Sequence, residues 1–338
     1  MKPVIQGWLL FLLGFLFFLP PPLALAQPNE NMLYFKSGYK GFNLGSGLNS
    51  TLTKSDLVRL KAIGFQLFRV NLKLNYNSQL GLFELKNLSE LFLNKLHGDL
   101  ESLGLKLIIS VVPSKVDWLR PDFEKELSLF WQQIAQRYRL DKTVIAFDII
   151  NEPTPPLLSR IDNERLWRNI ANSVIEGIRK IDNKIIVYEP APWGLPEGFK
   201  WLKPVDFENI VYSFHMYSPH KFTHQGIRAH KKRVHYPSIK EGLDIKYLRR
   251  VIEPVIKFQK KYDVPIYVGE FSAIRYAPVK SRKRYIADLL KIWKENGWSW
   301  TYHSYKEWDG WDPEIISTNP KVKQRVFDSE IMKMLVEY

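Results

Sequence analysis

The sequence predicts a single (β/α)8 barrel. Short apolar runs alternate with longer amphipathic segments from residue 41 to the end of the 338-residue chain. Eight of the runs have the length and composition of strands, and helical segments separate nearly all of them. Parallel neighbours in a sheet need crossover connections of this kind, so the alternation predicts a parallel sheet. Eight such units in about 300 residues match the size of a closed barrel.

The first half of the chain shows this alternation from residue 41 to residue 151. Leu57, Leu60 and Ile63 have helical spacing, and Ser55 is the expected N-cap of their helix. Continuous apolar runs predict buried strands. In order, the expected elements are strand Gly41–Gly45, helix Ser55–Ile63, strand Phe65–Val70, helix Leu88–Leu103, strand Lys106–Val112, helix Phe123–Tyr138 and strand Val144–Asn151.

The second half continues the pattern, with one long irregular segment at about Tyr217–Asp244, where we expect an active-site loop insertion. No linker or repeat divides the chain, so residues 27–338 are expected to form one domain. The expected elements are helix Ile161–Ile181, strand Lys184–Glu189, strand Ile210–His215, helix Leu248–Tyr262, strand Pro265–Glu270, helix Arg282–Asn296, strand Trp298–His303 and helix Val322–Val336.

An open doubly wound sheet is the alternative architecture. Its nucleotide-binding form carries a glycine-rich turn after the first strand, and Gly41, Gly45 and Gly47 do not have the required spacing. A P-loop lysine pattern is also missing from the sequence. The chain has no cysteine, which excludes disulfide scaffolds, cysteine-ligated zinc, iron–sulfur clusters and thiol catalysis.

Residues 1–26 have the pattern of a signal peptide. Lys2 is their only charge, an apolar run extends from Gly7 to Leu19, and three prolines precede the small-x-small sequence Ala24-Leu25-Ala26. We therefore expect cleavage of this leader and a secreted or periplasmic protein. An uncleaved membrane anchor is the alternative, since the apolar stretch reaches the lower limit of a span.

The formal charge of the whole chain is +14, and that of residues 27–338, which lack Lys2, is +13. Clusters of basic residues can bind nucleic acid, anionic lipid or an acidic glycan, but acids interspersed elsewhere favour a solvated basic surface. We expect no nucleic-acid partner and a monomer, with an anionic envelope surface as a further candidate partner. The clustered cations are Lys221, Arg228, Lys231, Lys232, Arg233, Lys280, Arg282, Lys283 and Arg284.

Four histidines, His220, His224, His230 and His235, lie in the long irregular segment. Histidines four residues apart suit a metal only on a helix face, and this segment shows no convincing helical period. No nearby carboxylate is placed to complete a ligand set. We therefore expect a solvated loop and no metal site.

Two glutamates follow expected strands at the end where barrel enzymes carry their active sites. Glu152 follows the fourth strand and Glu270 ends the seventh, so the two would face each other across the barrel mouth. Two facing carboxylates are what hydrolysis of a glycosidic bond requires, one to protonate the leaving oxygen and one to attack or stabilise the sugar centre. Glu189, which ends the fifth strand, is the competing candidate; it could equally cap a loop or pair with a lysine.

The sequence Asn151-Glu152-Pro153 after an apolar strand, with Glu270 118 positions later, resembles glycoside hydrolase family 5. Gly41–Gly45 and Gly64–Val70 resemble the first- and second-strand motifs of that family. The family belongs to a clan of retaining (β/α)8 glycosidases, and the resemblance covers most of residues 27–338. It implies that Glu152 is the general acid/base and Glu270 the nucleophile.

The resemblance also assigns supporting roles. Arg69 matches the arginine that holds the nucleophile, and Asn151 matches the amide that bonds the sugar 2-hydroxyl. His215 and Tyr217 match a His-x-Tyr pair whose tyrosine donates to the nucleophile. From the residues alone, Arg69 could be a structural ion pair and His215 a core histidine.

Two departures from the family pattern concern the substrate. The third strand lacks the usual terminal histidine, and His303 occupies the region where the family places a tryptophan platform. Trp308 or Trp311 in the following loop is the expected substitute. Trp118 and Trp193 also follow strands, where they either line sugar subsites or belong to the core.

The resemblance therefore implies a retaining β-glycosidase, in particular an endo-β-1,4-glucanase acting on an oligo- or polysaccharide, and the leader pattern of residues 1–26 predicts its export. No metal or organic cofactor is expected, because both reacting groups are side chains. The same chemistry on mannan, β-1,3-glucan or a glycolipid is an alternative. A catalytically idle barrel that binds glycans is another.

Overall fold

The computed structural model describes residues 29–338 except 46–50, 116, 157–158, 228–229 and 231. The expected signal peptide, residues 1–26, lies outside the described residues, as do Arg228 and Lys231 of the basic clusters. Within the described part, no helix has both the length and the apolar character that a membrane span requires.

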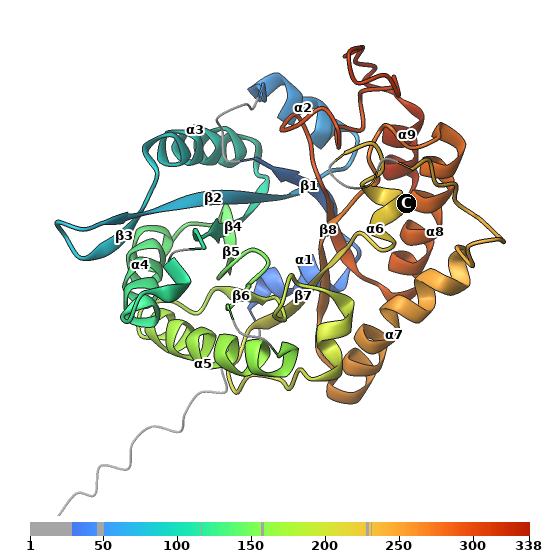
Figure 1. Ribbon diagram of the computed structural model, residues 1–338. Coiled ribbons are helices and arrows are strands. Elements are labelled where there is room, and N and C mark those ends of the chain that lie inside the picture. Colours follow the sequence, from blue (N-terminus) through green and yellow to red (C-terminus); the bar gives the residue numbers. More distant parts are fainter. Residues whose placement is uncertain (1–28, 46–50, 116, 157–158, 228–229, 231) are drawn as a thin grey trace, which may run out of the picture.

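Eight parallel strands close into a barrel, which confirms the predicted fold class (Figure 1). The hydrogen-bonded order is β1-β9-β8-β7-β6-β5-β4-β2, and the pairing of β1 with β2 completes the ring. The strands of the barrel are β1 Lys40–Leu44, β2 Leu67–Asn77, β4 Lys106–Val112, β5 Val144–Asp148, β6 Ile185–Tyr188, β7 Ile210–Met216, β8 Ile266–Phe271 and β9 Ser299–Tyr302.

Helices surround the barrel, as Figure 1 shows. Their apolar residues face the strands: along α7, Leu248, Ile252, Val255 and Phe258 recur at helical spacing and are buried. The described helices are α1 Leu33–Lys36, α2 Lys54–Ala62, α3 Asn87–Leu103, α4 Phe123–Tyr138, α5 Arg160–Arg179, α6 His220–Thr223, α7 Ile245–Tyr262, α8 Val279–Asn296 and α9 Glu330–Glu337, with 3₁₀ turns η1 Glu30–Met32, η2 Asp117–Leu119 and η3 Pro196–Lys200.

The amino-terminal end of the barrel is closed by α1. Phe35 of this helix is 1% exposed and packs edge-to-face on Tyr267, with ring centroids 5.4 Å apart. Around it lie apolar residues from near the starts of the strands: Leu67, Ile108, Ile145, Ile185 and Val211. Since this end is filled, polar groups inside the barrel are accessible only at the carboxyl ends of the strands.

Several predicted ends are shifted by up to three residues, as where α7 begins at Ile245 and β5 ends at Asp148, and four further details differ from the sequence prediction. Strand β2 continues past Val70 to Asn77 and pairs antiparallel with an unpredicted strand, β3 Leu82–Leu85. Thr53, and not Ser55, is the N-cap of α2: its hydroxyl accepts from the backbone of Asp56, whose carboxylate accepts the Thr53 backbone N–H. A short helix, α6, interrupts the segment that was expected to lack helical structure.

The fourth difference concerns the last helix. The prediction of a helix over Val322–Val336 is wrong in its first half, because α9 begins at Glu330 with Ser329 as its cap. Arg325 explains the difference: it forms ion pairs with Asp312 and Glu314. It also forms a β-bridge with Ile315, which keeps the preceding residues out of the helix.

Candidate active site

A cleft of about 710 Å³ opens at the carboxyl ends of the strands. It lies where a (β/α)8 barrel is expected to carry its active site. Carboxylates, histidines and tryptophans dominate its walls, which contain no lysine or arginine among the described residues. The lining residues are Glu152, Trp193, Leu195, His215, Tyr217, His220, His224, Ile227, His230, Glu270, His303, Trp308 and Trp311.

Glu152 and Glu270 face each other across the floor of this cleft. One carboxyl oxygen of each lies within 4.8 Å of the other and of a ring nitrogen of His215. Glu152 follows β5 in the left-handed conformation, with φ at 50°, and its side chain is 29% exposed to the cleft. Glu270, within β8, is 5% exposed. The predicted pair therefore meets at one place.

Hydrogen bonds to both of its oxygens fix the Glu270 carboxylate. Oε1 accepts from Arg69 Nη1 and Asn71 Nδ2, both at 3.0 Å. Oε2 accepts from the Tyr217 hydroxyl at 2.8 Å, and His303 Nδ1 lies 3.6 Å away. The three hydrogen bonds, from Arg69, Asn71 and Tyr217, favour the ionised carboxylate.

Arg69 is the centre of the buried network below the cleft. It is fully buried on β2 and forms ion pairs with Asp148, Glu189 and Glu270 at 2.7, 2.8 and 3.0 Å. It also donates to the side-chain oxygen of Asn151 at 3.0 Å. One guanidinium thus orients carboxylates from three other strand ends, a geometry that its planar fork of donors permits.

His215 lies between Glu152 and Glu189. Its Nδ1 is 2.9 Å from Glu152 Oε1, and its Nε2 is 3.0 Å from Glu189 Oε1. Glu189 Oε2 also accepts the backbone N–H of Glu152 at 2.9 Å. The residue that competed with the predicted pair is therefore part of the same network, but it lies beneath the cleft and does not line it.

The surroundings separate the pKa values of the two facing carboxyls. Burial raises the pKa of Glu152; the hydrogen bond from His215 opposes this rise, and the charges of Glu270 and Glu189 add to it. Burial also opposes ionisation of Glu270, but His303, His215 and Arg69 outweigh it and hold its pKa well below the usual range. A pair with one raised and one lowered pKa suits an acid and a nucleophile.

Tryptophans form the walls of the cleft. Trp193 and Trp308 are 51% and 41% exposed, so both offer ring surface to a ligand, whereas Trp311 is 9% exposed. Trp311 packs near His303, with ring centroids 6.2 Å apart. Trp118 does not line the cleft and packs on Phe123 and Trp167. Trp118 and Trp193 could each have lined a sugar subsite or belonged to the core; Trp193 lines the cleft and Trp118 does not.

The histidine-rich segment also reaches the site. His220, His224 and His230 line the cleft, so the expectation of a merely solvated loop is wrong for these three. The reason is α6, which places His220 and His224 one turn apart with their rings stacked at 4.6 Å. The segment supplies one wall of the cleft, as expected for an active-site loop.

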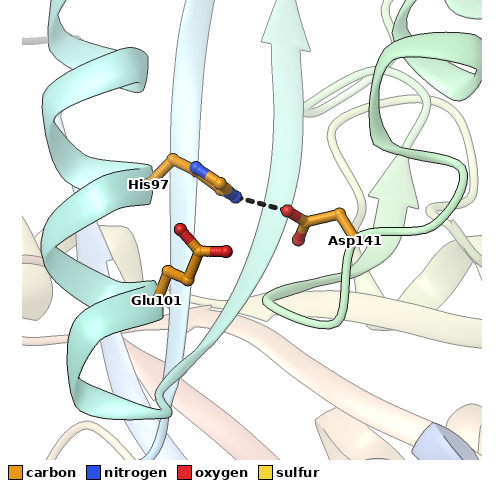
Figure 2. A group of neighbouring side chains, drawn as sticks. All are labelled: His97, Glu101 and Asp141. Carbon is orange, nitrogen blue, oxygen red and sulfur yellow. Dashed lines mark hydrogen bonds and ion pairs between the residues drawn. The ribbon is translucent and has the colours of Figure 1, made fainter.

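A cluster of side chains of the kinds that can bind metal ions lies away from the cleft. His97 and Glu101 on α3 point toward Asp141 in the loop before β5, as Figure 2 shows. Asp141 Oδ2 is 2.6 Å from His97 Nε2, and Asp141 Oδ1 accepts the backbone N–H groups of Thr143 and Val144. These hydrogen bonds explain the cluster structurally, because they attach the loop before β5 to α3.

The predicted site residues Arg69, Asn151, Glu152, His215 and Tyr217 all converge here, together with Glu270, His303 and Trp308. Sequence reasoning did not select Asn71 or Asp148 and left Glu189 without a role. Asn71 had a usable signal, since it lies two residues after Arg69 and a strand returns to the same face at that spacing.

Comparison with known proteins agrees with this geometry. Residues 34–309 match the family model described as Cellulase (glycosyl hydrolase family 5). Endoglucanase C of Acetivibrio thermocellus is 29% identical over 217 residues, which cover 56% of this chain and 62% of that protein. The match thus spans less than two thirds of the length of this relative.

Solved structures with the same fold include Cel5A of Thermotoga maritima. Its complex with cellobiose superimposes with a TM-score of 0.73 at 21% identity, covering 89% of this chain and 98% of the other. Its complex with mannotriose gives a TM-score of 0.74 at the same identity and coverage. At this identity the likeness establishes the (β/α)8 fold.

Proposed function

The chain belongs to glycosyl hydrolase family 5, and on that premise we propose that it is a retaining β-glycosidase that cleaves internal β-1,4-glucan bonds. The observation that carries the proposal is the facing pair Glu152 and Glu270, with carboxyl oxygens within 4.8 Å of each other. Retaining enzymes hold these groups about 5–5.5 Å apart, whereas inverting enzymes leave about 6.5–9.5 Å for a water molecule.

In the first step the Glu270 carboxylate attacks the anomeric carbon and forms a glycosyl ester. The bond from that carbon to the leaving oxygen breaks, and Glu152 transfers its proton to this oxygen. The lowered pKa of Glu270 and the raised pKa of Glu152 support this division of roles.

In the second step Glu152, now a carboxylate, takes a proton from water. The resulting hydroxide attacks the anomeric carbon, and the ester bond to Glu270 breaks. Both partners return to their starting protonation states, and the configuration at the anomeric carbon is retained. Side chains supply every reacting group, so the proposed mechanism uses no metal or organic cofactor.

The remaining site residues position the sugar and the nucleophile. Arg69 and Tyr217 hold Glu270, and Asn151, itself held by Arg69, is available for the sugar 2-hydroxyl. His303 and Trp308 flank the sugar that bonds to Glu270, with the exposed Trp308 ring as the stacking surface. The backbone N–H of Trp193 donates to the carbonyl of Pro153, next to Glu152, at 3.2 Å, and on this basis we assign the exposed Trp193 ring to the leaving sugar.

The cellulose-like substrate rests on the named relatives and on the shape of the site. The relatives include proteins named endoglucanase, and a neighbour of the same fold was solved with cellobiose and with mannotriose. The cleft also contains aromatic surface for sugar rings. Export through the leader of residues 1–26, action as a monomer and contact with an anionic envelope surface complete the proposal.

Two substitutions test the assignment. Glu270→Gln and Glu152→Gln should each abolish hydrolysis of carboxymethylcellulose while the protein remains folded. Azide should restore turnover of an activated aryl cellobioside by Glu152→Ala, giving a β-glycosyl azide, because a small anion can attack the ester without base catalysis. Full activity in either Gln variant would contradict the roles.

A glycan panel tests the substrate. Wild-type protein is digested in parallel with cellulose oligosaccharides, mannan, β-1,3-glucan and a glucosylated lipid. Cleavage of internal bonds in the first is the expected result. Preferential cleavage of another member would reassign the substrate and keep the mechanism. Turnover of none of them, nor of an aryl cellobioside, would favour a glycan-binding barrel without activity.

A further inference from the structure

Glu189 is a buried carboxylate with no role in the two chemical steps. It is 1% exposed at the end of β6 and touches three other parts of the site. Its oxygens contact Arg69 at 2.8 Å, His215 at 3.0 Å and the backbone N–H of Glu152 at 2.9 Å. A merely structural ion pair with Arg69 would not require the contacts to His215 and Glu152.

The position of Glu189 constrains the protons on His215. An anionic oxygen 3.0 Å from Nε2 requires a proton on that nitrogen, because two lone pairs would repel. The other ring nitrogen, Nδ1, lies 2.9 Å from Glu152 Oε1. If Nδ1 carries no proton, it accepts the acidic proton of Glu152. If it carries a proton, it donates to Oε1 and leaves the acidic proton on Oε2.

Only the second arrangement is productive. A proton held between Glu152 Oε1 and Nδ1 is engaged by His215. Glu152 lines the cleft with 29% of its side chain exposed, so a proton on the oxygen that does not contact His215 is the one a substrate there can take. We propose that Glu189 is a positioning residue that keeps His215 as an imidazolium, so that Glu152 presents its proton to the leaving oxygen. This inference rests on the acid/base role of Glu152 in the proposed function.

The charges around His215 agree with an imidazolium. Glu152 and Glu189 lie on its two nitrogens, and Glu270 Oε2 is 3.8 Å from Nδ1. Burial by itself would lower the pKa of His215, but the negative charges of Glu189 and Glu270 and the hydrogen bond to Glu152 raise it well above its ordinary value.

The other charged groups around His215 do not provide the contact that Glu189 makes with its Nε2 atom. Arg69 is already engaged by Asp148 and Glu270, and burial raises the pKa of Asp148. Tyr217 donates to Glu270, and His303 Nδ1 lies 3.6 Å from the same carboxyl oxygen. Among these groups, Glu189 is the anion that contacts Nε2 of His215, at 3.0 Å.

A second contact gives Glu189 control over the backbone of Glu152. The N–H that it accepts belongs to a residue with φ at 50°, a conformation that is costly for a side chain larger than glycine. Glu189 therefore fixes both the backbone and the ring that hold the proposed proton donor. These contacts come from one side chain, so a single isosteric substitution tests them.

The test is Glu189→Gln with two aryl cellobiosides. Hydrolysis of the phenyl compound needs a proton on the leaving oxygen, whereas the 2,4-dinitrophenyl compound leaves without one. Loss of the anion lowers the proton affinity of the coupled His215–Glu152 pair. The alkaline limb of kcat/KM for the phenyl compound should move to lower pH by about one unit or more. Its rate near neutrality should fall about 10- to 100-fold, and the dinitrophenyl rate should fall less than threefold.

Glu164→Gln is the matched control. Glu164 is also buried, and it holds the same chain segment through the Tyr188 hydroxyl and the Ala191 N–H, but it does not contact His215. Burial raises its pKa to about 7, so the neutral amide is a close mimic. In Glu164→Gln we expect the alkaline limb of kcat/KM for the phenyl compound to stay at the wild-type pH. An unmoved limb in Glu189→Gln, with equal losses for both substrates, would reduce Glu189 to a structural role.

A direct measurement on the wild-type protein covers the case in which the variant does not fold. The ¹⁵N chemical shifts of His215 should show both ring nitrogens protonated at neutral pH, and a neutral ring would overturn the inference. The experiments also separate the two proposals. If wild type cleaves neither cellobioside, the proposed function fails, while the protonation state of His215 is still read from its spectrum.

Discussion

At the scale of single residues, one buried arginine balances the charge of several carboxylates in the site. Arg69 is fully buried and contacts Asp148, Glu189 and Glu270 together. Burying charges is costly unless each has a partner, and removing one partner leaves the others unpaired in a poorly solvated place. Arg69 therefore supports both the fold and the ionisation of Glu270.

We expect Arg69→Met to destabilise the protein by about 3–5 kcal/mol at pH 7, because three carboxylates lose their shared cation. The measurement is urea unfolding followed by circular dichroism. Arg137→Met is the control: Arg137 and its partner Glu90 are both well exposed, so its loss should cost about 1 kcal/mol or less. Equal effects of the two substitutions would contradict the buried network.

The pH dependence of this difference has a definite sign. In the wild type the pKa values of Glu189 and Glu270 are lowered, so the stability they contribute is fully present above their unfolded values of about 4.3 and is lost only as pH falls below them. Between pH 7 and about pH 4 the change therefore comes from the variant. Without Arg69 these carboxyls have less reason to ionise, and protonation relieves their burial. The stability gap between wild type and Arg69→Met should therefore narrow between pH 7 and about pH 4.

The sequence predicted the positions of some site residues but not of others. Glu152 and Glu270 were predictable, because barrel strands deliver strand-end groups to one rim. Glu189 met the same criterion and competed with them. Its depth below the cleft depends on where β6 ends relative to its neighbours, and on the loop through Trp193 that covers it. Neither follows from the local pattern of residues.

At the scale of elements, periodicity predicted the existence of strands and helices better than their ends. Helix α4 and strand β4 were predicted with the observed bounds, since both have unbroken apolar patterns. The β2–β3 hairpin was missed although its signal is present. Leu72, Leu74 and Tyr76 alternate with polar residues, and Gly81 lies in the turn with φ at 66°.

The cap of α2 shows the same point and gives a prediction. Thr53 precedes α2, whereas Ser55 lies in its first turn, and only Thr53 has an acidic residue, Asp56, three positions later to complete a capping box. We expect Thr53→Ala to lower the free energy of unfolding by about 1 kcal/mol, because the backbone N–H of Asp56 loses its side-chain acceptor. Ser55→Ala, at the position first expected to be the cap, is the control and should cost less. The opposite order in urea titrations would contradict the observed cap.

At the scale of the whole molecule, closure of the barrel explains how residues so distant in sequence form one site. Asn43 and Thr301 lie at opposite ends of the chain, yet Asn43 Nδ2 is 3.0 Å from Thr301 Oγ1 and 2.6 Å from the carbonyl of Gly269. The alternation of strands and helices was enough to predict that ring. The wall built by α6 was not predictable, because four helical residues carry too little periodicity.

Net charge is the other property of the whole molecule, and the lysines and arginines that make it positive are not found in the described lining of the cleft. The chain carries +14, while the described lining of the cleft contains no lysine or arginine. The excess cations therefore lie on outer surfaces, among them Lys257, Lys260 and Lys261 on α7, all exposed. Attraction of such a surface to anions is long-ranged and is weakened by salt.

We therefore expect adhesion and catalysis to separate as salt is raised. The protein should sediment with vesicles rich in anionic lipid at about 20 mM salt and dissociate near 500 mM, where the Debye length is only a few ångströms. Cleavage of an uncharged cello-oligosaccharide should change less than twofold over the same range, because the substrate is neutral and the site is lined by buried, paired charges. Neutral vesicles are the control. Equal binding to neutral vesicles, or loss of hydrolysis in step with dissociation, would show that the outer charge does not act independently of the cleft.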